Sequence, residues 1–383
     1  MTADTVGGVW PYALELAAGL ARRGVLSLIA AMGDAPTPAQ RRDAARIAGV
    51  QLVHRPFRIE WMPDGAGDLA PAGAWLMDLA GRFRPDIVQI NGYDAATSPW
   101  RCPVVVVCHS CVRSWWRAVR GCEAPPEWRA YGRRVAQGLA AADAVIAPTA
   151  AFLADMRALY GPLPPAAVIH NSRSAGVFRP AAVKEPVIVT AGRLWDQAKN
   201  VALVETVAPR LPWPVAMAGD GGGRQGAANV HALGVLDQAA LAGWLGRAAI
   251  FTLPARYEPF GLAVLEAALS ECALVLGDIA TLRELWRDAA LFVDPDDPAG
   301  LEAALRRLID DPGLRRALAA AARERAETFS PESMTERYLA AYRGARAHAA
   351  HRKRADESRI GAARKNERTG RAPAWGKERG AAP

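Results

Sequence analysis

The most informative segment of the chain is Arg256-Tyr-Glu-Pro-Phe-Gly-Leu-Ala-Val-Leu-Glu-Ala-Ala-Leu-Ser-Glu271. The apolar run that precedes it, Ala248–Leu253, has the length and the β-branched and aromatic content of a buried strand. From Leu262 onward apolar residues recur at helical spacing, so the pattern predicts a strand, a loop and a helix. Glu258 then lies in the loop at the carboxyl end of a strand, and Glu266 lies one turn into the helix. In open α/β sheets ligands bind at this edge, where the free N–H groups of a helix N-terminus favour an anion.

Glu266 is the odd residue of this stretch, because it is a carboxylate on an otherwise apolar helix. Burying it without a partner would cost several kcal/mol, so we expect a hydroxyl or a cation to meet it. The ordinary alternative is an acidic residue near the positive end of a helix, paired with a structural arginine. The residue alone does not decide between a ligand and an arginine as its partner.

A second pattern lies at Gly192-Arg-Leu-Trp-Asp-Gln-Ala-Lys199, which follows a predicted strand beginning at Glu185. Two cations six residues apart around a loop can grip a diphosphate from two sides. A solvated loop with ordinary surface charges would show the same residues. Strands and helices alternate along the rest of the chain as well, which predicts parallel sheets with right-handed crossovers.

Both patterns resemble a known family. Glu258 to Glu266 resembles the E-x7-E motif, and Gly192 to Lys199 the G-R-x5-K element, of retaining nucleotide-sugar glycosyltransferases, family 4 in particular. The resemblance extends over nearly all of residues 5–345. It implies the GT-B fold, an α/β architecture in which two Rossmann-like domains with parallel sheets face each other across a cleft. The implied reaction moves a sugar from a nucleoside-diphosphate sugar to an acceptor hydroxyl with retention of configuration, in glycan or glycolipid synthesis.

We expect four segments. Residues 1–180 form an N-terminal Rossmann-like domain on the acceptor side, and residues 181–330 form the nucleotide-sugar-binding domain. The boundary lies at the end of Asn171–Pro180, which resembles the family's crossover. A serine–proline start then opens a helix, 331–347, that returns to the first domain. Residues 348–383 are rich in Arg, Ala and Gly without periodicity and are predicted to be disordered.

The resemblance assigns a charge-stabilising role to the two loops. Negative charge develops on the leaving diphosphate, and Arg193, Lys199 and the N–H groups of Phe260, Gly261 and Leu262 are expected to stabilise it. A preorganised donor of this kind contributes about 3 kcal/mol to lowering the barrier. Such a site needs no divalent metal.

By the same resemblance, Glu258 holds hydroxyls of the donor sugar, Glu266 holds the ribose hydroxyls and Gly192 belongs to the nucleotide site. No side chain stands out as a general base, so the leaving phosphate is expected to take the acceptor's proton. The partners are therefore a nucleotide-sugar donor and a carbohydrate or lipid-linked acceptor. No cofactor is expected besides the donor itself.

Three further residues are carried over from the family. Gly7 and Gly8 are expected to form a loop over the donor's phosphates, although a glycine pair alone predicts no more than a tight turn. Six residues precede this pair, and only about three of them remain for the full apolar strand that family members usually place there. His109 follows a predicted strand and is expected near the transferred sugar; by itself a lone histidine is more often structural.

No metal site is predicted. Cys102, Cys108, Cys111 and Cys122 are close in sequence, but Cys108 ends a strand-like run where a small buried hydrophobe is expected, and no second close ligand pair follows. The D-x-D pair Asp294-Pro-Asp296 is assigned to a loop far from the site.

The composition describes a soluble globular chain, since 51% of its 383 residues are hydrophobic and 22% are charged. We expect no membrane span, because no run of eighteen uncharged apolar residues occurs, and no signal peptide, because the N-terminus lacks a basic segment followed by an apolar one. Five cysteines without an export signal favour reduced thiols. The predicted location is the cytoplasm.

The net charge of +8 belongs to the tail, because residues 341–383 carry twelve Lys/Arg and four Asp/Glu and the rest of the chain is neutral. The tail has no aromatic stacking series, so specific nucleic-acid binding is not expected. Its charge is compatible with weak attraction to the anionic inner face of a membrane.

Two other classes stay open from the sequence. One is a GT-B epimerase, which would release free sugar without transfer. The other is a catalytically inactive GT-B protein whose basic tail is attracted to a membrane or to nucleic acid. The sequence does not identify the donor nucleotide, its sugar or the acceptor, because these depend on loop shapes.

Overall fold

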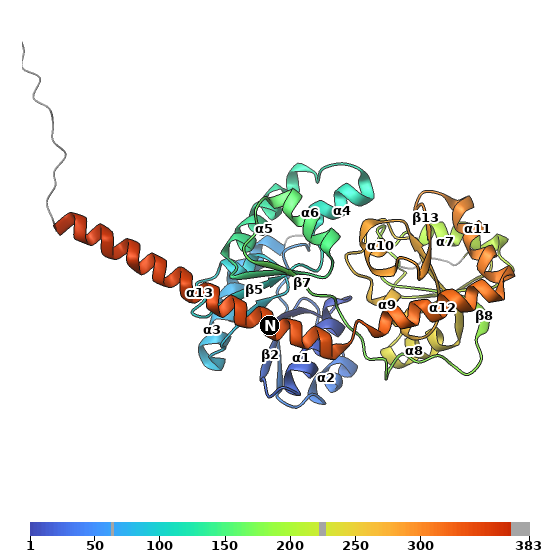
Figure 1. Ribbon diagram of the computed structural model, residues 1–383, viewed down its shortest axis with the longest axis horizontal. Helices are drawn as coiled ribbons and strands as arrows, with labels where there is room; N and C mark the ends of the chain where they lie inside the picture. The colour runs from blue at the N-terminus through green and yellow to red at the C-terminus, as the bar shows by residue number, and fades with distance from the viewer. Residues whose placement is uncertain (63–64, 222–226, 369–383) are drawn as a thin grey trace, which may run out of the picture.

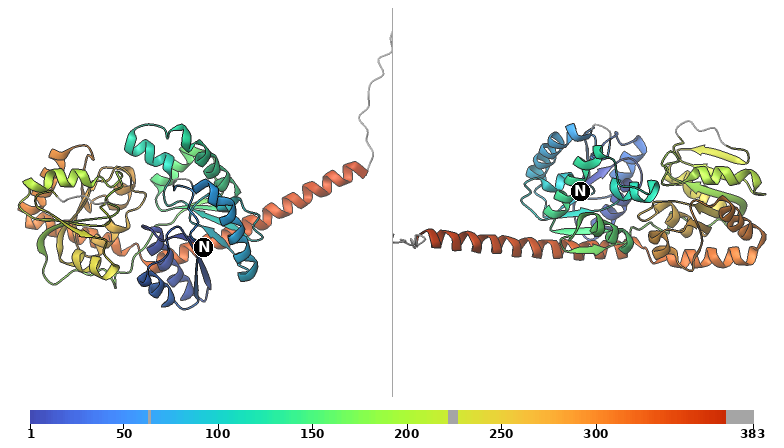
Figure 2. Two further views of the ribbon diagram at one scale, coloured as in Figure 1. Left: turned by 180° about the vertical axis from the view of Figure 1, so that it is seen from behind. Right: turned by 90° about the horizontal axis from the view of Figure 1, so that it is seen from above.

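The computed structural model describes residues 1–62, 65–221 and 227–368. In the last helix it describes side chains as far as Lys353. Two α/β domains lie side by side, and the final helix runs along the first of them (Figures 1 and 2). The strands of the first domain are β1 (Thr2–Asp4), β2 (Ser27–Met32), β3 (Val50–His54), β4 (Val88–Ile90), β5 (Val104–Val107), β6 (Ala144–Ala147) and β7 (Ala166–Val168).

The strands of the first domain are parallel but do not form one continuous ladder. They pair in the orders β1-β2-β3 and β4-β5-β6-β7. Between β1 and β4 the connection runs through a side chain: the Asn91 backbone N–H donates to Thr2 Oγ1 at 2.9 Å, and Asn91 Nδ2 donates to the Thr2 carbonyl at 2.7 Å. Both β1 and β4 are three residues long, so the asparagine takes the place of ladder bonds.

Helices cover both faces of this sheet. They are α1 (Val9–Ala21), α2 (Pro38–Ala45), α3 (Leu69–Phe83), α4 (Val112–Arg120), α5 (Arg129–Ala141) and α6 (Ala150–Tyr160), with 3-10 turns η1 (Gly65–Asp68), η2 (Asp94–Thr97) and η3 (Pro126–Trp128). The all-valine strand β5 is buried on both sides, as its continuous apolar run predicts. Two starts are capped by threonine: Thr37 and Gln40 form a capping box on α2, and Thr149 accepts from the Phe152 N–H on α6.

The second domain has one parallel sheet in the order β10-β9-β8-β11-β12-β13. Its strands are β8 (Glu185–Ala191), β9 (Val215–Ala218), β10 (Val230–Gly234), β11 (Ala248–Leu253), β12 (Ala273–Gly277) and β13 (Ala290–Val293). Its helices are α7 (Val201–Val207), α8 (Gln238–Arg247), α9 (Leu262–Leu269), α10 (Ala280–Trp286), α11 (Pro298–Asp310) and α12 (Pro312–Glu327), with the 3-10 turn η4 (Ala208–Arg210). The predicted strand, loop and helix around Glu258 are therefore present, and α9 begins at Leu262 as expected.

Strand order places the site. In both domains the first strand lies beside the fourth: β8 pairs with β11, and β1 contacts β4 through the bonds of Asn91, so the strand order reverses at both places. Ligands of open α/β sheets bind at such switch points, at the carboxyl ends of the strands. The glycine loop follows β1, while Arg193 follows β8 and Glu258 follows β11.

The last helix, α13 (Pro331–Arg368), crosses back over the first domain and then projects from it (Figure 1). Its first half packs on α1, where Tyr12 OH donates to Tyr338 OH at 2.6 Å. The prediction that 331–347 is helical and 348–383 is disordered is wrong for residues 348–368, which continue the helix. Alanine and arginine are strong helix formers, so a segment without apolar periodicity still forms a helix here. Residues 369–383 lie outside the described residues.

The first part of this extension stays attached to the domain, because Arg352 pairs with the buried carboxylate of Asp143 at 3.0 Å. Within the described part of the chain, no helix combines the length and the apolar character that crossing a membrane would require.

Candidate active site

The glycine loop of the first domain meets the arginine loop of the second. Gly7 has a φ of +80°, a conformation that only glycine adopts without strain, and a Cβ there would lie 3.3 Å from Arg193 Nη1. A Cβ at Gly8 would lie 3.3 Å from Leu262 Cδ1, at the start of α9. A larger residue at either position would therefore press on a side chain of the second domain, which would have to shift by a few tenths of an ångström. The carboxyl ends of the two sheets face each other here, as the resemblance implies.

Lys199 and Glu258 form an ion pair at the second domain's switch point. Their Nζ and Oε2 atoms are 2.5 Å apart, and both side chains are mostly buried. The Glu258 carbonyl accepts a hydrogen bond from Thr281 Oγ1 at 2.7 Å, which fixes the loop between β11 and α9. Gly192 adjoins the pair, since a Cβ there would lie 3.7 Å from the Lys199 side chain. Two predicted ligand-binding residues are thus in direct contact.

Arg193 is held by a carboxylate that the sequence analysis did not single out. Its Nη2 lies 3.0 Å from Oδ2 of Asp196, which is buried, whereas Arg193 is one-third exposed. Burial opposes ionisation of Asp196, but Arg193, Lys199 and hydrogen bonds from Ala198 N and Trp115 Nε1 outweigh it and lower the pKa of this carboxyl. Each of the two cations at this site, Arg193 and Lys199, is therefore paired with a carboxylate.

The start of α9 adds backbone N–H groups to this cluster. Gly261 has a φ of +90° and precedes the helix, and a Cβ there would lie 3.3 Å from Glu258 Cγ. Glycine thus permits the tight turn between Glu258 and Leu262. Phe260 is buried in the core of the second domain, which anchors the turn. The first N–H groups of a helix have no intrahelical acceptor and remain able to bind an anion.

Glu266 lies apart from that cluster and meets a cation. Its Oε1 is 2.7 Å from Nε of Arg173, on the crossover segment, and both side chains are nearly inaccessible. Arg173 also lies 3.6 Å from Glu15 Oε2 of α1. Burial raises the pKa of Glu266, and Arg173 opposes that rise. The structural arginine foreseen as an alternative is present, while the predicted contact with a ribose remains a prediction.

His109 belongs to an uncharged network of the first domain. Its Nε2 lies 3.1 Å from Asn91 Oδ1, and Asn91 is oriented by its Nδ2 bond to the Thr2 carbonyl. Because Oδ1 can only accept, His109 Nε2 carries the proton and Nδ1 is left with its lone pair. Burial lowers the pKa of His109 to about 3, so the imidazole is neutral at physiological pH. The edge of its ring meets Tyr12, with ring centroids 4.5 Å apart.

Four contacts at the site were missed by sequence reasoning: those of Asn91, Asp196, Arg173 and Tyr257. Asp196 lies inside the G-R-x5-K element and Tyr257 precedes Glu258, so position in a motif could have found these two. No local pattern identifies Asn91 or Arg173, because their partners are distant in sequence.

The prediction that Asp296 lies on a loop far from the site is wrong. Its carboxylate pairs at 2.5 Å with Arg256, which precedes Glu258 by two residues. Within residues 1–62, 65–221 and 227–368 no group of three or more His, Cys, Asp or Glu side chains is arranged to hold a metal.

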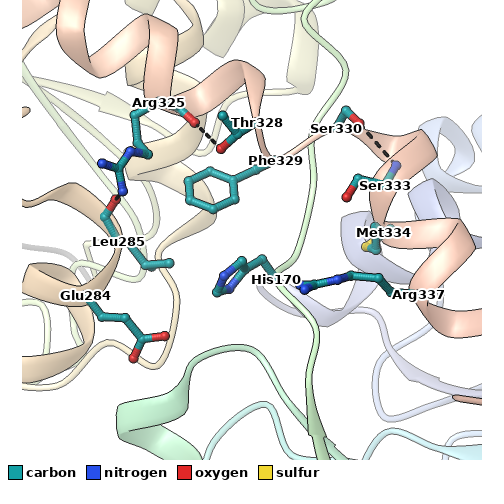
Figure 3. A pocket seen from close by; sticks show the side chains of 10 residues that line it. All are labelled: His170, Glu284, Leu285, Arg325, Thr328, Phe329, Ser330, Ser333, Met334 and Arg337. Atoms are coloured by element: carbon teal, nitrogen blue, oxygen red, sulfur yellow. Dashed lines mark hydrogen bonds between the residues drawn. The ribbon is translucent and has the colours of Figure 1, made fainter.

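A cavity of about 460 Å³ lies elsewhere, between α10, the end of α12 and the start of α13 (Figure 3). It is lined by His170, Glu284, Leu285, Arg325, Thr328, Phe329, Ser330, Ser333, Met334 and Arg337. Several of its polar groups are already engaged, since Thr328 donates to the Arg325 carbonyl, Arg325 to the Leu285 carbonyl, and Ser333 N–H to Ser330 Oγ. None of the predicted site residues lines it, and its polar groups serve the junction between the domains.

Comparison with known proteins identifies the families of the two domains. Residues 6–173 match the model of Glycosyltransferase Family 4, and residues 185–311 match that of Glycosyl transferases group 1. A D-inositol 3-phosphate glycosyltransferase of Xylanimonas cellulosilytica is 26% identical over 88% of this chain and 91% of its own length. A glycogen synthase of Mycobacterium tuberculosis is 40% identical over 121 residues, which span 30% of this chain and only 29% of that protein.

Solved structures share the whole fold at low sequence identity. A sucrose-phosphate synthase from Thermosynechococcus elongatus has a TM-score of 0.74 and 18% identity, covering 89% of this chain and 94% of its own. Anabaena HepE in complex with UDP and glucose has a TM-score of 0.70 and 16% identity, covering 88% and 97%. These likenesses confirm the predicted fold, in which two Rossmann-like domains are joined in the GT-B manner.

Proposed function

The chain belongs to the GT-B glycosyltransferases, with a family 4 domain followed by a group 1 domain, and from this membership we propose that it is a retaining hexosyltransferase. It moves a sugar from a nucleoside-diphosphate sugar to an acceptor hydroxyl, in glycan or glycolipid synthesis. The observation that carries the proposal is the meeting of Gly7 with Arg193 across the domains, beside the Lys199–Glu258 pair.

The charges of the site suit a diphosphate. Arg193 and Lys199 are each held by a carboxylate, so their positions are fixed before a ligand arrives. A leaving diphosphate gains charge as the anomeric bond breaks, and preorganised cations and helix N–H groups stabilise that charge without reorganising. In this proposal the diphosphate lies between Gly7, Arg193, Lys199 and the start of α9, and it takes the acceptor's proton. These cations do the work that a divalent metal does in other enzymes.

The carboxylates contact the rest of the donor. When a phosphate pairs with Lys199, the Glu258 carboxylate is free to accept from hydroxyls of the sugar. Glu266 keeps Arg173 on one oxygen and presents the other to the ribose hydroxyls. His109, neutral and with Nδ1 unprotonated, accepts a hydrogen bond from a hydroxyl of the transferred sugar.

The names of similar proteins suggest where to begin the search for substrates. HepE has been crystallised with UDP and with UDP-glucose, so uridine donors are tested first. Inositol phosphate and glycogen are the first acceptors to test, because the relatives in sequence are named a D-inositol 3-phosphate glycosyltransferase and a glycogen synthase. We propose a cytoplasmic location, with weak attraction of the basic tail to an anionic membrane face and no specific nucleic-acid partner.

The test is a panel of nucleotide sugars, each incubated with the full-length protein, with and without EDTA. We expect one donor to be consumed, transfer to an added acceptor, and an α-donor to give an α-product by proton NMR, with EDTA making no difference. Free sugar without transfer would favour the epimerase instead. If no donor of the panel is consumed while Arg193→Ala and the native chain bind UDP equally weakly, the proposed function is wrong.

A further inference from the structure

Tyr257, the residue before Glu258, reaches out of its own domain and into the first one. Its hydroxyl lies 3.0 Å from the backbone N of Cys111 and 2.8 Å from Ser114 Oγ, both at the start of α4. Its ring meets Phe152 of α6 edge-on, with centroids 6.3 Å apart, and packs against the apolar core of the first domain. Tyr257 therefore belongs to the loop proposed to bind the donor, while its side chain packs in the first domain.

Three hydrogen bonds among Tyr257, Ser114 and Cys111 form a closed ring, and the direction of each bond is fixed. Ser114 has one hydroxyl proton and donates it to the Cys111 carbonyl at 2.9 Å. Tyr257 must then donate to Ser114 Oγ, and it accepts from the Cys111 N–H. Two of the three bonds, those of Tyr257, join the two domains, so removing the tyrosine hydroxyl leaves a donor and an acceptor without partners.

Both neighbours of Glu258 are tied to the first domain. On the other side, the Pro259 carbonyl accepts from Thr149 Oγ1 at 3.0 Å, at the cap of α6. The loop after β8 is tied to the same helix as Tyr257, because Trp115 Nε1 of α4 donates to Asp196 Oδ1 at 3.1 Å. The segment from His109 to Trp115 therefore contacts both loops that carry the predicted donor-binding residues.

We propose that Tyr257 is a positioning residue, which sets the Glu258 loop in register with α4 and with His109 two residues before Cys111. This inference rests on the proposed function, since it concerns the alignment of donor and acceptor for transfer. Tyr257 itself touches neither substrate. Its loss lets the domains shift against each other, and displacements of about 1 Å at a reacting centre can cost about 100-fold in rate.

The experiment compares Tyr257→Phe with two other variants of the full-length chain. Tyr160→Phe is the matched control, because the Tyr160 hydroxyl contacts Cys111 Sγ in the same cluster but both residues belong to the first domain. Ser114→Ala removes the opposite partner of the ring. For each we would measure kcat and donor KM for transfer, hydrolysis of the donor identified by the panel, and the radius of gyration by small-angle scattering with UDP present.

We expect Tyr257→Phe to lower kcat for transfer by about 10- to 100-fold with donor KM changed less than threefold. Hydrolysis should fall less than transfer, and the radius of gyration should increase. Ser114→Ala should reproduce these changes, and the double variant should be no worse than either single one. Tyr160→Phe should behave like the native chain.

The inference is overturned if Tyr257→Phe keeps native transfer, or if Tyr160→Phe loses as much, which would mark a structural role of the whole cluster. A rise in donor KM alone would also overturn it, because that would place Tyr257 in donor binding. If the native chain consumes no donor, the proposed function fails and the inference fails with it. Native turnover with an unaffected Tyr257→Phe rejects the inference alone.

Discussion

The two switch points of the molecule share a strand order and differ in charge. In the second domain the sheet is continuous between β8 and β11, and the loops above it carry the pairs Arg193–Asp196 and Lys199–Glu258. In the first domain the ladder is interrupted between β1 and β4, and the gap is bridged by Asn91, which also accepts from the neutral His109. The same topology thus supports an ionic site in one half and an uncharged one in the other.

The difference follows from what each half is proposed to hold. A diphosphate requires cations, and cations held by carboxylates keep their places when no ligand is bound. A sugar or an acceptor hydroxyl requires donors and acceptors of fixed direction, which a neutral network supplies. In the first domain that network continues from Asn91 through Gln89 to Tyr12 and Tyr342, so α13 supports it from behind.

The comparison predicts that the largest effect on stability comes from breaking a buried charge pair. Glu266→Ala should lower the free energy of unfolding by about 3 to 5 kcal/mol, because it leaves the Arg173 guanidinium buried with Glu15 at 3.6 Å and the neutral Gln238 as its remaining partners. Urea denaturation measures this. Arg173→Met added to Glu266→Ala should restore part of the loss. A change below about 1 kcal/mol would mean that the pair is not buried in solution.

Removing a cation of the site itself should affect turnover rather than stability. Arg193→Ala should lower kcat by roughly 100- to 1,000-fold, since a preorganised donor to a developing charge is lost. Its melting temperature should stay within a few degrees of the native value, because the side chain is one-third exposed. Steady-state kinetics and thermal melting are measured on the same preparation. Native kcat in this variant would remove Arg193 from the site.

The buried neutral histidine of the first domain should make the free energy of unfolding depend on pH. The pKa of His109 is lowered by burial from 6.5 to about 3, so between these values the unfolded chain binds a proton that the folded chain does not. The stability from keeping this histidine neutral is therefore complete above pH 6.5 and is lost as the pH falls toward 3. From pH 7.5 to 5 the native chain should lose about 1 to 2 kcal/mol more than His109→Gln.

Urea denaturation at the two pH values tests this, and the exposed His231 provides the control. The variant His231→Gln should lose as much stability as the native chain on acidification. If His109→Gln does the same, then His109 is charged in the folded protein at pH 5.

The smallest effect is expected where an uncharged hydrogen bond is removed at the outer end of the first domain's neutral network, two hydrogen bonds away from Asn91. Tyr342→Phe deletes the bond from Tyr342 OH to Gln89 Oε1 and should lower the free energy of unfolding by about 1 kcal/mol. Turnover should be unchanged, as measured with the donor from the panel. A loss of unfolding free energy as large as that of Glu266→Ala would mean that the uncharged network stabilises the fold as much as the buried ion pair does.

Much of the second domain could be predicted because its signals are local. The run Ala248–Leu253 is apolar throughout and forms β11, and apolar spacing after Gly261 fixes the start of α9 at Leu262. The G-R-x5-K element places Arg193 and Lys199 in one loop after β8, where the structure pairs each of them with a carboxylate, and their role in binding a donor stays a prediction. The basic tail was predicted less well, since its composition was read as disorder and its alanine and arginine residues form a helix as far as Arg368.

The alternation of strands and helices, the family and the positions of the charged loops can be predicted from the amino-acid sequence, because they depend on residues close together along the chain. Which charged side chains form pairs depends on the tertiary structure. Glu266 meets Arg173 at a separation of 93 residues, Lys199 meets Glu258, and Tyr257 meets α4 of the other domain. Such partners are chosen by how two sheets and their loops pack, and no local pattern of residues carries that information.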